Sequence, residues 1–145
     1  MINLTDKIKK MAEELADKLA TKALETAQTN FNNAEYAGDN DVIVTREDIS
    51  KTEKKIVADG NATLFIEFGA GVRYPDSHPE AGKLGVKHGT YGLGRGASPK
   101  GWRYRGSKGN APDTKVTKSG LIHTYGNKAN LCMYNAREAA KELVK

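Results

Sequence analysis

The stretch "TDKIKKMAEELADKLATKALETAQTN", Thr5 to Asn30, decides the fold of this chain. Its apolar residues recur at intervals of three and four, which is the spacing of a helix with one apolar face. We expect a helix over 5–30, about 37 Å long at 1.5 Å per residue, capped by Asn3 or Thr5 and packed across a sheet. Its many alanines favour close approach to a neighbour, in the same chain or in another subunit. The apolar positions are Ile8, Met11, Ala12, Leu15, Ala16, Leu19, Ala20, Ala23, Leu24 and Ala27.

Residues 40–70 carry the pattern of a small antiparallel sheet. The segments "NDVIVTREDI", "TEKKIVADG" and "NATLFIEFGAG" alternate in polarity and are separated by Gly, Asn and Asp, which predicts three strands joined by turns. The third strand would place Leu64, Ile66 and Phe68 on one face, with Thr63, Phe65 and Glu67 on the other. The Glu67 carboxylate would then be either solvated or paired with a basic residue at a contact.

The segment 71–125 differs in kind from the rest of the chain. It holds 11 of the 15 glycines and all four prolines, with ten basic and three acidic residues, a net charge of +7 in a chain whose total is +5. So long a stretch without periodic apolar residues predicts an extended loop, with short strands around "KLGVKHG" and "GWRYRG". Its aromatic residues argue against simple disorder, because they supply large contact areas. They include Tyr74, Tyr91, Trp102 and Tyr104.

A second helix is expected over 128–144, since its apolar residues fall on one narrow side. Those residues are Leu131, Met133, Ala136, Ala139, Ala140 and Leu143. The chain is therefore predicted to be one α+β domain over residues 1–145. Its long N-terminal helix packs on a small antiparallel sheet, and a long Gly-rich basic loop precedes the C-terminal helix.

Catalytic and cofactor signals are weak. "GLGRGA", residues 92–97, matches a dinucleotide pattern by letter, but "SPKG" follows it and cannot open the helix that the pattern needs. The histidines His78, His88 and His123 have no zinc-site spacing. Cys132, the only cysteine, is expected to be a small buried residue. We expect no enzyme activity, no cofactor and no metal, and the charged N-terminus predicts neither a signal peptide nor a membrane span.

The segment "GRGASPKGWRYRGSKG", residues 94–109, leaves three readings open. Its cations could follow the phosphates of a nucleic acid while its aromatics stack on bases. Arg, Trp and Tyr also anchor protein interfaces, and a solvated loop is the third reading.

Four phrases occur in a familiar order: "ATLFIEFGAGVRYP" (62–75), "HPEAGKLGVKHGTYG" (78–92), "GWRYRG" (101–106) and "LIHTYGNKANLCMYNAREA" (121–139). In this order the chain resembles the neck and tail-completion proteins of tailed bacteriophages over about Leu15 to Lys145. Relatives often carry a proline before the last helix, where this chain has Lys128-Ala129-Asn130. That departure leaves the entry angle of the helix open.

The resemblance implies a structural virion protein without enzyme activity. Such a protein would form a homo-oligomeric ring, of six copies, between the head connector and the tail. Its partners would be further copies of itself, portal or connector proteins, and tail-tube or tail-terminator proteins. It would contact the exiting DNA non-specifically, and it would lie in the virion neck after assembly in the host cytoplasm. An alternative is a basic, non-enzymatic module that binds nucleic acid through residues 94–109.

Two sets of contact residues are expected on the ring reading. The assembly interface would use Glu67, Phe68, Arg73, Tyr74, Leu93, Trp102 and Tyr104. The DNA channel or an acidic partner would meet Arg95, Lys100, Arg103, Arg105 and Lys108.

Overall fold

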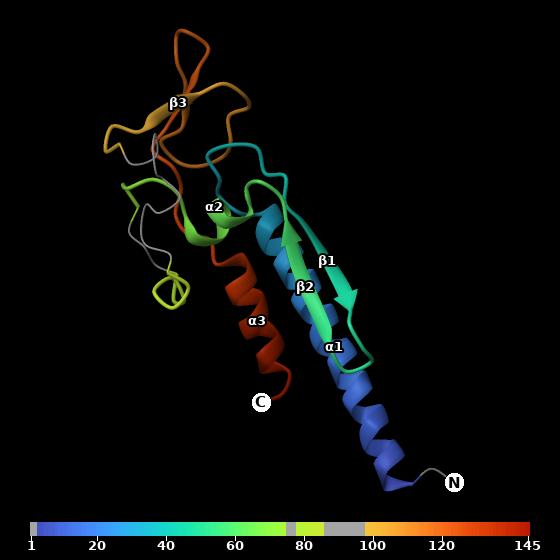
Figure 1. The fold of residues 1–145 in the computed structure, drawn as a ribbon. Helices are drawn as coiled ribbons and strands as arrows, with labels where there is room; N and C mark the ends of the chain where they lie inside the picture. The colour runs from blue at the N-terminus through green and yellow to red at the C-terminus, as the bar shows by residue number, and fades with distance from the viewer. Residues whose placement is uncertain (1–2, 75–77, 86–97) are drawn as a thin grey trace.

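The computed structural model describes residues 3–74, 78–85 and 98–145, and it confirms the predicted α+β fold (Figure 1). A long N-terminal helix, a hairpin and a C-terminal helix form the body, and a second small sheet lies at one end. The elements are α1 (Leu4–Asn32), β1 (Ile43–Asp48), β2 (Lys54–Asp59), α2 (Thr63–Phe68), β3 (Trp102–Tyr104), β4 (Lys115–Val116), β5 (Ile122–Thr124) and α3 (Cys132–Glu142).

Helix α1 begins where the sequence predicted. The Asn3 side chain accepts a hydrogen bond of 2.9 Å from the Asp6 backbone N–H, so Asn3 rather than Thr5 is the cap. The core lies against the C-terminal half of this helix, where Ala27 and Phe31 are fully buried. Apolar side chains from the hairpin, α2 and α3 close around them, because each element buries one apolar side there. They are Val42, Val44, Ala62, Ile66, Cys132 and Ala136.

Strands β1 and β2 form an antiparallel hairpin, with Ile43 opposite Asp59 and Asp48 opposite Lys54. The predicted third strand is wrong, because residues 63–68 form the short helix α2. A strand would put neighbours on opposite faces, whereas Ile66 and Glu67 are both buried. Six residues are too few to separate a short helix from a strand by periodicity.

The basic segment contains a second sheet that the sequence analysis placed only in part. Strands β3, β5 and β4 pair in that order, all antiparallel. Strand β3 confirms the short strand predicted at "GWRYRG". For the strand predicted at "KLGVKHG", residues 83–85 lie in a turn, and the others lie outside the described residues.

Two glycines let backbone segments approach closely at this sheet. Gly101 has φ +75°, and a Cβ there would lie 2.2 Å from the Thr124 carbonyl oxygen. Gly126 has φ +95°, and its Cβ would lie 2.0 Å from the Ala70 carbonyl oxygen. Both positions need a residue without a side chain. Backbone packs on backbone within the second sheet at Gly101 and between that sheet and the body at Gly126.

Helix α3 is shorter than the predicted helix over 128–144. It begins at Cys132 because the preceding residues are held by other contacts: the Asn130 N–H donates to the Ile66 carbonyl (2.9 Å), and Leu131 has φ 55°. Leu143, expected on the apolar side, is 51% exposed. The packing side of α3 is therefore its first two turns.

Candidate assembly surfaces

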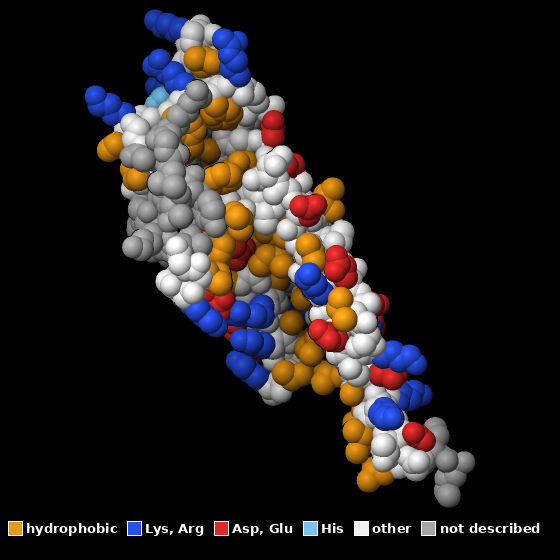
Figure 2. Space-filling model, viewed as in Figure 1, with side chains coloured by type: hydrophobic (Ala, Val, Ile, Leu, Met, Phe, Trp, Pro, Cys, Tyr) orange, Lys and Arg blue, Asp and Glu red, His pale blue; other side chains and the backbone are white. Residues whose placement is uncertain are grey.

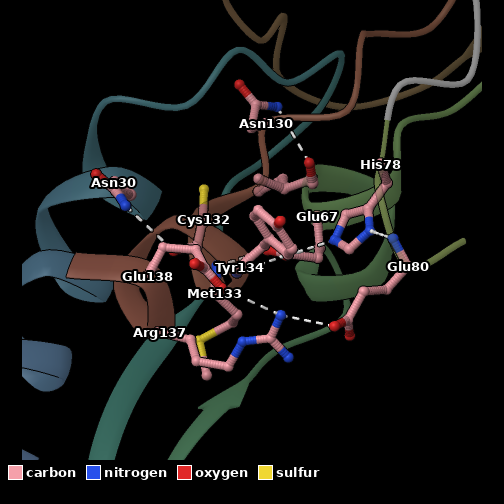
Figure 3. Close-up of polar contacts among 11 residues, drawn as sticks. Asn30, Glu67, His78, Glu80, Asn130, Cys132, Met133, Tyr134, Arg137 and Glu138 are labelled. Carbon is pink, nitrogen blue, oxygen red and sulfur yellow. Dashed lines mark hydrogen bonds and ion pairs between the residues drawn. The ribbon is translucent and has the colours of Figure 1, made fainter. Parts of the chain in front are cut away.

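Glu67 joins α2 to the start of α3 (Figure 3). Its carboxylate accepts hydrogen bonds from the backbone N–H groups of Met133 (2.7 Å) and Tyr134 (3.0 Å). These N–H groups belong to the first turn of α3, and Leu131 at its N-cap position offers no side-chain bond. Glu67 thus takes the place of a local cap, and its charge lies at the positive end of the helix.

His78 completes this junction. Its Nε2 lies 2.9 Å from Glu67 Oε1, and its Nδ1 accepts a 3.1 Å hydrogen bond from the Glu80 backbone N–H. Since Nδ1 accepts, the proton of the neutral ring sits on Nε2 and is donated to Glu67. The ring also contacts Phe68 and Tyr134 edge-on or tilted. Of the two expectations for Glu67, solvated or paired, the structure supports the pairing. The partner is His78 of the same chain.

The junction is buried, and its side-chain polar atoms are hydrogen-bonded within the chain. Every polar atom of Glu67 and His78 faces a protein partner, and the two residues are 5% and 7% exposed. Cys132 lies nearby and is buried, as expected, and burial together with the Glu67 carboxylate raises the pKa of its thiol to about 12. A thiol with such a pKa is a poor nucleophile. Within residues 3–74, 78–85 and 98–145, no three potential metal ligands gather.

A groove of about 800 Å³ runs between α1 and α3, with β2 and α2 also lining it. Figure 2 shows hydrophobic side chains gathered in this hollow. The wall on α1 is made mostly of small residues, with Ala12, Ala16, Ala20 and Ala23 alongside Leu15 and Leu19. The wall on α3 includes Met133, Ala136 and Ala140. The groove is therefore apolar and wide enough for side chains from outside the chain.

An ion pair between Arg137 and Glu80 lies at the rim of the groove. Arg137 Nη2 lies 2.6 Å from Glu80 Oε1, and this guanidinium holds the pKa of Glu80 below its usual value. Figure 3 shows the pair beside His78. The pair links α3 to the segment that carries His78, so it fixes one edge of the groove.

The N-terminal end of α1 projects beyond the hairpin and α3 (Figure 1). We call residues 4–15 the arm. Its apolar side chains are exposed: Leu4 by 73%, Ile8 by 57%, Met11 by 67% and Leu15 by 41%. The sequence analysis placed the last three on a buried packing face, and this is wrong. A six-residue strand spans about 20 Å, so the hairpin covers only part of a helix this long.

Basic side chains form a row on the second sheet. Arg103 on β3 lies opposite His123 on β5, which lies opposite Lys115 on β4. Residues paired in this way share one face of the sheet, and Arg103 and Lys115 are exposed. In the view of Figure 2, Lys and Arg side chains gather at this end of the molecule.

Four of the predicted interface residues are engaged within the chain. Arg73 lies 4.1 Å from the centre of the Tyr125 ring and 3.7 Å from Asp113. The Tyr74 hydroxyl donates to the Pro112 carbonyl (3.3 Å), and the Tyr104 hydroxyl bonds the carbonyls of Ser107 (3.0 Å) and Ala37. Trp102 is half-buried and lines a smaller pocket of about 440 Å³.

The remaining predicted residues divide into three groups. Phe68 lines the large groove with Glu67. Lys100, Arg103, Arg105 and Lys108 are exposed around β3. Leu93, Arg95 and His88 lie outside the described residues.

Sequence reasoning missed two features of these surfaces. It did not single out Lys115, which pairing places in the row with Arg103; the alternation around residues 115–124 was the available signal. It also expected the whole helix to pack across the sheet, whereas the apolar side chains of the arm are exposed.

Comparisons of the chain with known protein families, with curated proteins and with solved structures give no match. Among the described residues, no helix combines the length and the apolar character needed to cross a membrane.

Proposed function

We propose that this protein is a structural protein of the neck of a tailed bacteriophage, where it completes the tail and joins it to the head as a ring. The ring, of six copies, would lie between the head connector and the tail. The proposal extends the resemblance of the four sequence phrases to the surfaces described above. The chain would have no enzymatic role.

The observation that carries the proposal is the exposed apolar arm beside an open apolar groove. Four large apolar side chains on one helix are 41% to 73% exposed, and contiguous apolar surface on a small protein marks an interaction site. A ring needs two unlike surfaces on each subunit, because a head-to-tail contact closes into a cycle. The arm and the groove supply such a pair.

The junction around Glu67 supports the same proposal in another way. Residues from three of the four phrases meet there: Glu67 from the first, His78 from the second, and Met133 with Tyr134 from the last. The phrases therefore share a structural role, since they hold α2 and α3 together. A family of assembly subunits would share packing of this kind even when its members have no active site in common.

The test is the composition of virus particles. Quantitative mass spectrometry of purified particles should find the chain in about six copies per virion, and electron microscopy should place it between portal and tail. Absence of the chain from mature particles would overturn the proposal.

The row of Arg103, His123 and Lys115 favours a second candidate, a non-enzymatic nucleic-acid-binding module. Cations on one sheet face can contact successive phosphates, and such binding weakens steeply with salt. The double variant Arg103→Gln with Lys115→Gln should lower the salt slope of duplex binding by about 0.9 per lost phosphate contact.

A matched control for this second candidate removes the same charge from the C-terminal segment, residues 141–145. Lys141→Gln with Lys145→Gln changes side chains that pair only with Glu138 and Glu142 among the described residues. Equal salt slopes for the two double variants would exclude the sheet as the nucleic-acid surface.

A further inference from the structure

We infer that the groove between α1 and α3 is a docking site for the arm, residues 4–15, of a second copy of this chain. The inference rests on the ring proposed above and deepens it by naming the contact between subunits. It concerns association of the protein alone, so it can be tested without virus particles.

The arm cannot fill the groove of its own chain. Helix α1 is continuous from Leu4 to Asn32, and its wall of the groove begins at Ala12, within the arm itself. Folding the arm back would require a break in this helix, and residues 4–32 contain neither glycine nor proline. Among the described residues none covers the exposed side chains of the arm, and a second copy of the chain can do so.

The dimensions of the arm and the groove agree. From Leu4 to Leu15 the arm has 12 residues, and the groove wall on α1 from Ala12 to Ala23 also has 12. Each is about 18 Å long at the rise of a helix. The eleven residues of α3 on the other side give about 16 Å.

The side chains of the two surfaces also complement one another. The arm offers Leu4, Ile8 and Met11, which are large, and the groove wall on α1 offers alanine at four positions. Small residues let a second helix approach closely while large ones fill the space between helices. The arm and the groove share Leu15, so the two apolar surfaces form one continuous band.

Charge gives no obstacle to this contact. The arm carries Asp6, Glu13 and Glu14 against Lys7, Lys9 and Lys10, so its polar sides are balanced. Association through the groove should therefore depend little on salt, unlike binding of nucleic acid by the second sheet.

The size of the contact predicts how strong it is. Half the lateral surface of a helix about 10 Å wide and 18 Å long is roughly 300 Å², which is well below the ~800 Å² per partner of a stable complex. One docked arm should give weak, concentration-dependent association. A closed ring gives every copy two such contacts, one through its arm and one through its groove.

Sedimentation velocity of the purified full chain over a wide concentration range tests this contact. The wild type should shift from the 15.7 kDa monomer to larger species. Ile8→Glu with Met11→Glu should keep the monomer at the concentration where half of the wild type has associated. The control Lys9→Glu with Lys10→Glu changes the charge twice as much but spares the apolar band, and it should associate as the wild type does.

A mixing experiment separates docking of arm into groove from other contacts. Ala140→Arg places a long side chain in the groove on α3, and this variant alone should also stay monomeric. Mixed with the arm variant, it should form one-to-one pairs, because one copy supplies an intact arm and the other an intact groove. Circular dichroism and thermal unfolding check that both variants keep the fold.

Three results would overturn the inference: a wild type that stays monomeric at every concentration, an arm variant that associates like the wild type, or a mixture that forms no pairs. Each is distinct from failure of the proposed function. A chain that associates through the arm but is absent from particles would refute the phage role alone.

Discussion

The carboxylate of Glu67 should be the most costly charge in the chain to remove. It accepts three hydrogen bonds, from Met133 N–H (2.7 Å), Tyr134 N–H (3.0 Å) and His78 Nε2 (2.9 Å). Glu67→Gln keeps the shape of the side chain but replaces one acceptor oxygen with an NH₂ group. The new NH₂ group would then face one of the N–H groups that now donate to the carboxylate, and the negative charge at the start of α3 would be lost.

The magnitude follows from these contacts. A hydrogen bond to a charged group contributes about 1.5–3 kcal/mol, and a buried donor left without an acceptor costs a similar amount. Losing one such bond and weakening the other two should lower the free energy of unfolding by about 3 kcal/mol. At roughly 2–4 °C per kcal/mol for a chain near this size, Tm should fall by about 6–12 °C.

Thermal and urea unfolding of Glu67→Gln and of a matched control decide the point. The control is Glu142→Gln, on the last turn of the same helix, where the side chain is 64% exposed and pairs with Lys145. An exposed pair of this kind contributes less than about 1 kcal/mol. If the two variants unfold within about 0.5 kcal/mol of each other, the carboxylate does not cap α3 and the reasoning is refuted.

Three further predictions concern the fold. Gly126→Ala puts a Cβ 2.0 Å from the Ala70 carbonyl oxygen, so it should lower the urea midpoint far more than Gly120→Ala, which has φ +84° but no atom within 4 Å; equal midpoints would contradict the close packing. Cys132, with its pKa raised to about 12, should resist iodoacetamide at pH 8 in the folded protein and react fully in urea, and rapid native labelling would show that it is not buried. Two backbone N–H groups hold the pKa of Asp41 below its usual value, so its contribution is present above about pH 4 and is lost as pH falls through the lowered pKa. Asp41→Asn should therefore be less stable than the wild type near neutral pH and should converge with it in acid; a gap that is unchanged in acid would refute this.

The sequence predicted most of the architecture because its long elements have clear periods. Helix α1 was expected over 5–30 and spans Leu4–Asn32, since ten apolar residues repeat the helical spacing. The hairpin was predicted from alternation and from the turn that separates its strands. Both signals extend over enough residues to tell a period of 3.6 from a period of 2.

The short elements were not predictable in the same way. In α2, Leu64, Ile66 and Phe68 alternate as in a strand, yet distant contacts decide the conformation. The carbonyls of Ile66 and Glu67 accept hydrogen bonds from the backbone N–H groups of Asn130 and Leu131. These partners lie more than 60 residues away, so no local pattern could reveal them.

The surfaces were predictable only in part. Net charge placed the basic region in the right segment, but strand pairing decides which cations share a face. The arm was expected to pack across the sheet because its residues have the same periodicity as the buried half of α1. Periodicity identifies an apolar face, but it does not show whether that face is buried by the same chain or by another molecule.

Asn130 has a consequence for how the chain is made in the cell. Its side chain bonds both backbone groups of Glu35, 95 residues earlier, at 3.0 Å and 2.9 Å, and it also donates to the Ile66 carbonyl at 3.2 Å. The segment after α1 and the middle of α2 therefore lack these hydrogen bonds until Asn130 has left the ribosome tunnel. A product that ends before Asn130 would lack these hydrogen bonds.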